Sequence, residues 1–511
     1  MSARTLTFAD GGRPVGDVRR ALDAAGFELG PTRPERRTLL DTFDGRMASA
    51  GLRLEHRDDE VLVLSDRRST VQLAAAKRPQ FATELAGGPF RSRVAAATEV
   101  RALLPLRELT ARATPVRRRN GEDKIVAAAT IYERLADDGR PLAAPWVIEV
   151  DALTGYDKSA TRLVAVLDGM GLRSRDGDVF DLTGPVDGPG RHLSSPTIAL
   201  DPKTPAAEGF RAVLAHLAEA IKLNVPGTID NLDPEFLHDL RVAVRRTRSV
   251  LSNARRVLPA DVRTRARESF GWLGASTGDA RDLDVYELEW SDYTRQLPQD
   301  ALEPVRAHLD GLRHEAHERL ADLLRSEETA ELLAWWSGWL SSGSDGDDVP
   351  DRAAAPMREI VEARIVAAQR QLLTAGRAIT ASTPAPLVHE LRKDAKRLRY
   401  LLECFGGLYA PTARKAFVSR LKALQDNLGM HQDADVHVTH LRRIVAELAD
   451  GLPVDSFLAA GQLVEQLEQR RAATRAEFAA RFADYDSKAT RRALRELLAT
   501  TAERKSAIGT A

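Results

Sequence analysis

The C-terminal part of this 511-residue chain contains an internal repeat that limits how it can fold. The segment Leu237–Arg248 (LHDLRVAVRRTR) aligns with Val388–Arg399 (VHELRKDAKRLR) at an offset of 151 residues. Residues 273–285 align with residues 424–436 at the same offset and without a gap. A duplicated segment indicates a duplicated folding unit. We therefore predict two homologous helical bundles related by an approximate two-fold axis.

The character of the sequence changes along the chain. Residues 1–183 contain short alternating apolar runs punctuated by Gly and Pro, which predict an antiparallel α+β domain. Residues 184–206 are rich in Gly and Pro and predict a linker. Residues 207–511 show a 3.6-residue apolar period and predict an all-α domain. The expected parts of this domain are a first four-helix bundle, an acidic loop and a second four-helix bundle, at residues 207–340, 341–353 and 354–505.

The overall charge is balanced, with 74 Lys and Arg against 74 Asp and Glu. Neutrality excludes a bulk polycation that coats nucleic acid or membranes non-specifically, but it leaves room for a local site. The single cysteine, Cys404, excludes an internal disulfide framework and a cysteine-cluster metal site. No stretch reaches the roughly 20 apolar residues of a membrane-spanning helix, and the first residues lack a signal peptide's apolar core. We therefore expect a cytoplasmic protein without a membrane partner.

Each repeated helix carries a stripe of basic side chains. Asp233-Pro234 and Thr383-Pro384 predict the N-terminal caps of the two helices. At about 100° per residue, three basic residues of each helix share one face: Arg241, Arg245, Arg248, Arg392, Lys396 and Arg399. Cations at this spacing repel one another. The stripe is either a solvated face neutralised by acids on adjacent helices or an anion-binding surface. We favour the anion-binding surface because both repeats keep the basic row although their apolar residues differ, and because arginine binds phosphate oxygens in a forked geometry.

Each repeat also carries a histidine and a glycine–aspartate pattern. His238 and His389 lie in the first two turns of their helices, where histidine serves in packing and capping or binds an oxyanion near the positive helix end. The pattern Gly-xxx-Asp-x-Asp begins at Gly278 and again at Gly429. We interpret it as a paired helix break or close-packing glycine, followed by capping or Arg-pairing acids. A site for a hard cation requires more converging oxygens.

These motifs resemble the CHAD family, the conserved-histidine α-helical domain. The resemblance is carried by H-x-x-R-V-x-x-R-R-x-R at 238–248, H-x-L-R-K-x-x-K-R-L-R-Y at 389–400 and L-x-x-x-L-G-x-x-x-D-x-D-V at 424–436. It covers about residues 207–505 and implies two pseudosymmetric four-helix bundles that bind inorganic polyphosphate through basic residues between them. The residues to which the resemblance assigns this role are His238, Arg241, Arg245, Arg246, Arg248, His389, Arg392, Lys393, Lys396, Arg397 and Arg399.

Residues 1–183 resemble the CYTH domain, a triphosphate tunnel fold that often precedes CHAD. The resemblance is carried by residues 40–54, which are similar to Y-x-D-T-x-D-x-x-L-x-x-x-G-x-x-L-R, by Lys77-Arg78-Pro79 and by Trp146–Asp151, which is similar to W-x-x-E-x-E. In this family, basic groups inside an antiparallel barrel bind phosphate and carboxylates bind Mg²⁺ or Mn²⁺.

The metal-binding signature of the CYTH family, E-x-E-x-K, is missing. Ala3, Thr5 and Thr7 stand where its Glu, Glu and Lys would be, and they cannot supply anionic metal ligands. We therefore predict a catalytically inactive domain, with Glu149 and Asp151 as weak metal candidates. The basic residues expected to retain some anion binding are Arg53, Arg57, Lys77 and Arg112.

The leading hypothesis is a non-enzymatic protein that binds inorganic polyphosphate through its paired basic helices and associates with polyphosphate granules. One alternative is a metal-dependent triphosphatase or nucleotidyl cyclase in the N-terminal domain. The other is RNA or DNA binding by the basic stripe, which is disfavoured because the helices lack interleaved aromatics for base stacking. No cofactor is expected, and no protein partner is predicted.

Overall fold

A computed structural model describes most of the chain, namely residues 6–9, 13–66, 69–135, 141–151, 153, 155–172, 174–175, 179–180, 198–342 and 349–499. The chain divides into two compact units, Met1–Ser194 and Ser195–Ala511. The boundary falls within the predicted linker 184–206, of which residues 184–197 lie outside the described residues. Residues 343–348 of the predicted acidic loop lie outside them as well.

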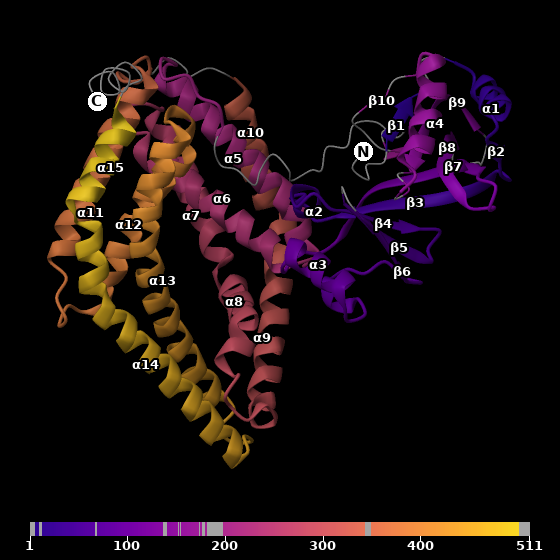
Figure 1. The fold of residues 1–511 in the computed structure, drawn as a ribbon. Helices are drawn as coiled ribbons and strands as arrows, with labels where there is room; N and C mark the ends of the chain where they lie inside the picture. Colours follow the sequence, from indigo (N-terminus) through magenta and orange to yellow (C-terminus); the bar gives the residue numbers. More distant parts are fainter. Residues whose placement is uncertain are drawn as a thin grey trace. The chain divides into compact units, whose positions relative to one another are not determined.

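The N-terminal unit is built around an antiparallel sheet, which confirms the predicted fold class and agrees with the resemblance to a CYTH domain (Figure 1). Within the described residues the sheet has ten strands in the order β10-β1-β9-β8-β7-β3-β4-β5-β6, with β2 paired to β7. The strands are β1 (Leu6–Ala9), β2 (Glu28–Leu29), β3 (Arg33–Asp41), β4 (Arg53–Arg57), β5 (Val61–Ser65), β6 (Thr70–Ala74), β7 (Leu104–Arg119), β8 (Ile125–Leu135), β9 (Pro141–Asp151) and β10 (Ser174–Arg175).

Helices cover one face of this sheet. Alternate residues of a strand point to opposite faces, so each strand offers one set of side chains to the helices and the other set to the opposite face. Val116 and Ile148 pack with Val18 of α1 and Leu163 of α4 in one buried cluster. A second cluster joins β3, β4 and β5 to α2 and α3. The bounds of these helices are Val15–Ala24 for α1, Arg46–Ser49 for α2, Pro89–Thr98 for α3 and Asp157–Gly169 for α4.

The opposite face of the sheet closes around a polar interior. Strands β3 and β9 are separated by β7 and β8 in the sheet order, yet Arg37 Nη1 on β3 donates to Glu149 Oε2 on β9 at 2.9 Å. In a flat sheet these strands would lie about 14 Å apart, because neighbouring strands are about 4.8 Å apart. The sheet is therefore strongly curved, as expected of a tunnel-like fold.

The C-terminal unit is helical, which confirms the predicted all-α class. Its helices are α5 (Ala206–Ile229), α6 (Pro234–Asn253), α7 (Ala260–Ser276), α8 (Gly278–Tyr293), α9 (Gln299–Arg325), α10 (Glu327–Ser342), α11 (Met357–Arg377), α12 (Ala385–Cys404), α13 (Pro411–Glu447), α14 (Val454–Tyr485) and α15 (Lys488–Leu498). In the part of the chain that the structure describes, no helix has both the length and the apolar character needed to span a membrane.

The helix boundaries repeat at the offset of the sequence repeat. Helices α5 and α11 begin 151 residues apart, and so do α6 and α12, and α7 and α13. The segments that precede α5 and α11 pair as an antiparallel bridge between Pro205 and Pro356, which are themselves 151 residues apart. Two backbone hydrogen bonds flank this bridge, from the N–H of Ala206 to Ala355 at 2.8 Å and from the N–H of Met357 to Thr204 at 2.9 Å. Adding or subtracting 151 turns one bond into the other, so the approximate two-fold axis passes through this bridge.

The two halves differ at the glycine–aspartate pattern. In the first half the chain breaks at Thr277 between α7 and α8, whereas α13 runs without a break through Gly429. The predicted paired helix break is therefore wrong for the second repeat. Thr277 Oγ1 donates to the backbone oxygen of Gly274 at 3.0 Å and competes with the helical hydrogen bonds. The equivalent residue in the second half is Leu428, which has no hydroxyl group.

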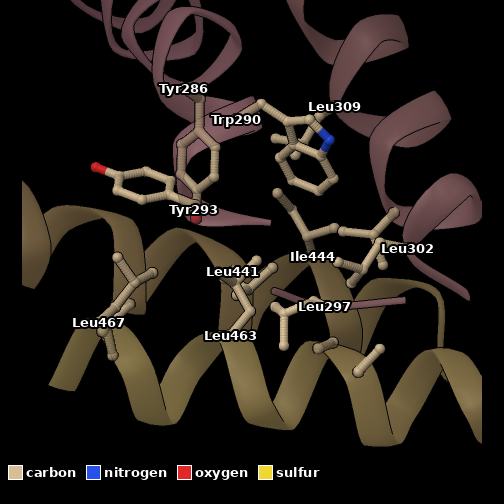
Figure 2. Close-up of a cluster of buried hydrophobic side chains, with 14 residues drawn as sticks. Tyr286, Trp290, Tyr293, Leu297, Leu302, Leu309, Leu441, Ile444, Leu463 and Leu467 are labelled. Carbon is tan, nitrogen blue, oxygen red and sulfur yellow. The ribbon is translucent and has the colours of Figure 1, made fainter. Parts of the chain in front are cut away.

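An apolar cluster joins the two halves of the helical unit. It gathers side chains of α8 and α9 from the first half and of α13 and α14 from the second (Figure 2). Trp290 and Leu441 occupy equivalent positions of the repeat, and both lie in this cluster. The halves therefore share a core, which fixes the position of the basic helices of one half relative to those of the other.

Candidate functional site

Helices α6 and α12, which carry the two basic stripes, pack against each other. Helix α6 begins as predicted, with the side chain of Asp233 accepting hydrogen bonds from two backbone N–H groups of the first turn. Helix α12 has Pro384 as its N-cap and lacks a side-chain cap. Thr383, the predicted cap, instead accepts from the backbone N–H of Thr380 at 2.8 Å. The two helices still begin 151 residues apart, so their stripes occupy equivalent positions.

Four half-buried cations from the two stripes influence one another. Burial lowers the pKa of Arg241 to about 10, and the neighbouring charge of Arg245 lowers it further. Burial also lowers the pKa of Arg392 on α12, and Arg245 of α6 adds to that effect. The pKa of Lys396 falls to about 7, first because of burial and then because of the charges of Arg392, Arg245 and Arg241. The structure thus brings together the central cations of both repeats, and we call Arg241, Arg245, Arg392 and Lys396 the central cations.

The central cations have unused hydrogen-bonding capacity. Arg241 Nη1 donates to Thr277 Oγ1 at 2.8 Å, and Arg392 Nη2 lies 3.3 Å from Asp433 Oδ1. The Nε atoms of both arginines are nevertheless buried without a hydrogen-bond partner. Within the described residues the Lys396 ammonium makes no hydrogen bond or ion pair. An unmet buried donor costs about 1–3 kcal/mol, so an anion that accepts from these groups would be bound favourably.

Most of the other predicted cations are already paired with acids. Glu403 of α12 accepts from Arg246 Nη2 of α6 at 2.7 Å and from Arg399 Nε at 2.6 Å. The exposed Lys393 and Arg397 pair with Glu390 and Asp394, each at 2.7 Å. Arg248 is exposed. The eleven predicted ligand residues therefore separate into a central group with few partners and an outer group that is largely neutralised.

The two predicted histidines lie at the edge of the central cations. His238 and His389 are both half-buried. His389 Nδ1 lies 2.7 Å from Gln432 Oε1 of α13, a contact that orients the imidazole ring. The placement fits either the packing role or the oxyanion role expected from the sequence.

The aspartates of the repeated pattern lie close to the basic groups. Asp284 Oδ1 accepts from Arg313 Nε at 2.9 Å, and Asp435 Oδ1 accepts from Arg471 Nη1 at 2.7 Å, so both are Arg-pairing acids as interpreted from the sequence. Burial raises the pKa of Asp282, Arg241 lowers it, and Asp433, the residue equivalent to Asp282, raises it. Asp282 and Asp433 therefore lie near each other beside the central cations. Within the described residues, no group of three or more His, Cys, Asp or Glu side chains is placed to hold a metal ion.

Comparison with known proteins identifies the helical unit. Residues 212–442 match the family model described as the CHAD domain. Residues 212–442 are a CHAD domain. No curated protein matches the chain. Among solved structures, the crystal structure of the CHAD domain from the plant Ricinus communis matches with 27% identity and a TM-score of 0.45, covering 59% of this chain and 95% of that one. PptA from Streptomyces chartreusis matches with 17% identity and a TM-score of 0.44, covering 55% of this chain and 100% of that one.

Arg281 is a further cation of the CHAD domain that sequence reasoning missed. It lies at the start of α8, and its Nη1 donates to the backbone oxygen of Pro234 at 3.1 Å. Burial lowers its pKa, and the charge of Arg245 contributes to that shift. Its equivalent in the second repeat is Gln432, so a search for duplicated cations passes over it. Its position one residue before Asp282 was the available signal.

The interior of the N-terminal unit contains an ionic network. Arg37 is 1% exposed, and its guanidinium donates to Glu55 through Nε at 2.8 Å and Nη2 at 2.9 Å and to Glu149 through Nη1 at 2.9 Å. Arg53 pairs with Glu55 at 2.5 Å and with Glu149 at 3.5 Å, and Arg57 donates to Glu55 at 3.0 Å. We call these five residues the ionic core. Two of the predicted anion-binding residues, Arg53 and Arg57, are therefore already bound to carboxylates.

The other two predicted anion-binding residues lie elsewhere. Lys77 is exposed and follows β6. Arg112 alternates on β7 with Ala111 and Ala113, which are buried beside the interior, so it shares the helix-covered face with Val116. The structure does not bring the four predicted residues together.

The carboxylates of the N-terminal unit do not fit the divalent cation that the CYTH resemblance implies. Glu149 faces the guanidinium groups of Arg37 and Arg53 and also accepts from the backbone N–H of Val179 at 3.3 Å. Asp151, two residues later on β9, is exposed. Thr7 pairs in register with Glu149 and offers no second carboxylate beside it, while Ala3 and Thr5 lie outside the described residues.

Proposed function

We propose that this chain binds inorganic polyphosphate through the central cations of its CHAD domain. The observation that carries the proposal is the juxtaposition of Arg241 and Arg245 of α6 with Arg392 and Lys396 of α12, half-buried and with few acceptors. Four mutually repelling cations are costly in the empty site. A chain of phosphates offers each of them an acceptor with a matching charge. The resemblance of the repeated motifs to CHAD sequences supports the same ligand.

The approximate two-fold symmetry favours polyphosphate over a nucleic acid. Arg241 corresponds to Arg392 and Arg245 to Lys396, so the site offers the same chemistry in both directions along a bound chain. Polyphosphate reads the same from either end, whereas an RNA or DNA strand has a direction. Tyr286 and Tyr293 lie in the buried cluster between the halves and are not available to stack on bases.

The direct test is a titration of the full chain with polyphosphates of defined length, followed by isothermal calorimetry. We expect the variant Arg241→Gln/Arg392→Gln to lose at least about tenfold in affinity, because each charge-assisted hydrogen bond contributes about 1.5–3 kcal/mol. The matched control is Lys393→Gln/Arg397→Gln, which removes the same charge from exposed, acid-paired positions. Equal affinities of the two variants would show that the central cations are not the binding site.

Salt dependence gives a second measurement. If the four central cations neutralise four phosphates, the slope of log K against log salt should be about −3, by analogy with single-stranded nucleic acids. Adding a tenfold excess of single-stranded RNA should leave polyphosphate binding unchanged. Displacement by RNA at equal phosphate concentration would favour the nucleic-acid alternative instead.

We also propose that the N-terminal unit has no phosphohydrolase activity. The support is its ionic core, in which Glu55 and Glu149 are neutralised by guanidinium groups rather than left to bind a metal. The test is phosphate release from triphosphate with Mg²⁺ or Mn²⁺. Release that disappears in Glu149→Gln would contradict the proposal.

Recruitment to polyphosphate granules is the cellular expectation of this proposal. A fluorescent fusion of the full chain should accumulate at the granules of a host that makes them. The Arg241→Gln/Arg392→Gln fusion should be dispersed, and the Lys393→Gln/Arg397→Gln fusion should behave like the unmodified one. Dispersed fluorescence of the unmodified fusion would contradict granule recruitment.

A further inference from the structure

Lys396 differs from the neighbouring Lys393 in its surroundings, although both lie on α12. Lys393 is exposed and pairs with Glu390 at 2.7 Å. Lys396 is half-buried, and its ammonium makes no hydrogen bond or ion pair within the described residues. The charges of three arginines act on it, one from its own helix and two from α6, against a single acid, Asp433 of α13.

We propose that Lys396 is a site of acylation by acyl phosphates. The flanking guanidinium groups of Arg241, Arg245 and Arg392 would hold the phosphoryl end of such a molecule, since arginine binds phosphate oxygens in a forked geometry. The acyl carbon, one bond away from the phosphate oxygen, would then lie beside the lysine nitrogen. Holding the two reactants together in this way raises the rate of the reaction between them.

The reaction balances without a further reagent. The lone pair of Lys396 Nζ attacks the carbonyl carbon of the acyl phosphate, and the bond between that carbon and the phosphate oxygen breaks. Inorganic phosphate leaves with the bonding electron pair and takes up the proton that the nitrogen loses. The arginines stabilise the phosphate as it leaves. The product is an amide that no longer carries the lysine charge.

The protonation state of Lys396 supports its role as a nucleophile. Only an unprotonated amine can attack, and an ordinary lysine, with a pKa of about 10.4, is almost fully protonated at neutral pH. Burial and the three arginines lower the pKa of Lys396 to about 7, so near neutrality a large share of it is unprotonated. The same charges that prepare the site for a phosphate also prepare the lysine for reaction.

Acylation would also change binding at the site. Removing one of the four central charges removes a partner for the polyanion. This consequence rests on the proposed polyphosphate function, whereas the selective reactivity of Lys396 does not. Acylation would therefore switch the CHAD domain to weaker polyanion binding.

The test is to incubate the full chain with acetyl phosphate at pH 7.5 and follow acetylation by mass spectrometry. Cleavage after glutamate releases residues 391–403 as one peptide that contains both Lys393 and Lys396, so the two rates are measured in the same fragment. We expect Lys396 to react at least about tenfold faster than Lys393, because its larger unprotonated fraction outweighs the lower nucleophilicity of a weaker base. In Arg241→Gln/Arg392→Gln this advantage should fall.

Two arms separate this inference from the proposed function. Equal acetylation of Lys396 and Lys393, in a chain that binds polyphosphate, would overturn the inference and leave the function in place. Preferential acetylation of Lys396 that polyphosphate does not block would support the inference and count against the function. A rate advantage that persists with acetic anhydride, which has no phosphate, and is unchanged in Arg241→Gln/Arg392→Gln would show that the arginines do not hold the acyl phosphate and would overturn the proposal.

Discussion

Tyr286 donates its hydroxyl hydrogen to the backbone oxygen of His437 at 3.0 Å, and these two residues occupy equivalent positions of the repeat. Contact between equivalent residues occurs only close to the axis that relates the two halves. The same axis passes through the bridge between Pro205 and Pro356. The two contacts therefore locate the axis at two points of the helical unit. Burial lowers the pKa of His437 to about 4, with smaller contributions from His440 and Arg470, so at neutral pH its imidazole is uncharged beside this contact.

Removing the hydroxyl of Tyr286 should weaken the interface between the halves. In Tyr286→Phe the buried backbone oxygen of His437 loses this donor, which we expect to lower the free energy of unfolding by about 1 kcal/mol. The control is Tyr400→Phe, because the hydroxyl of the half-buried Tyr400 makes no hydrogen bond within the described residues. Denaturant titrations of both variants measure the difference. Equal stabilities of the two variants would show that the contact contributes nothing.

The pairing of the outer cations predicts a graded response to single substitutions. Arg392→Gln removes a half-buried central cation and should weaken polyphosphate binding about tenfold. Arg397→Gln removes an exposed cation paired with Asp394 and should weaken binding less than about threefold. Calorimetric titrations at one salt concentration make the comparison. A larger effect at position 397 would place the ligand on the outer cations.

Polyphosphate binding should be coupled to proton uptake at Lys396. In the empty site the pKa of Lys396 is about 7, because burial and the charges of Arg392, Arg245 and Arg241 outweigh the opposing charge of Asp433. A bound polyanion favours the charged form and raises that pKa. Because the bound state has the higher pKa, affinity is greatest below pH 7 and falls as pH rises, by at most about tenfold per pH unit.

Calorimetry in buffers with different ionisation enthalpies counts the protons taken up. At pH 8 we expect nearly one proton for the unmodified chain and almost none for Lys396→Arg, which stays charged. Long polyphosphates are the suitable ligand, since terminal phosphates also titrate near pH 6. The same proton uptake in both proteins would assign the coupling to another group.

The repeat allowed much of the helical unit to be predicted, because a constant offset carries both the helix boundaries and the stripes. Local spacing also revealed some pairs, such as Lys393 with Glu390 three residues earlier. Spacing within one helix could not show which cations stay unpaired. That depends on how α6 packs on α12, since Glu403 of α12 neutralises Arg246 of α6.

The ionic core of the N-terminal unit was not predictable from spacing. Arg37 and Glu149 are 112 residues apart and lie on strands that are not neighbours in the sheet. Their contact depends on the curvature of the whole sheet. The local pattern identified Glu149 as an inward carboxylate but gave no indication that an arginine from β3 would reach it.

The ionic core should make the N-terminal unit sensitive to loss of Arg37. Arg37→Met leaves Glu55 and Glu149 buried with less compensating charge, and removing one partner of a buried ion pair costs about 3–5 kcal/mol. The control is Arg36→Met, the adjacent residue, whose exposed guanidinium pairs with the exposed Asp59 and contributes about 1 kcal/mol or less. Denaturant unfolding that shows equal losses for both variants would contradict a stabilising role for the core.

The same network predicts how the unit responds to acid. Burial alone would raise the pKa values of Glu55 and Glu149, but Arg37 and Arg53 outweigh it and hold both below the ordinary range. A carboxyl group with a lowered pKa in the folded state stabilises the fold above its unfolded pKa of about 4.3, and that contribution is lost as pH falls below this value. The N-terminal unit should therefore lose stability steeply below about pH 4, and Glu55→Gln should flatten this dependence. Thermal unfolding between pH 3 and 7 measures the slope, and an unchanged slope in Glu55→Gln would assign the acid sensitivity to other carboxylates.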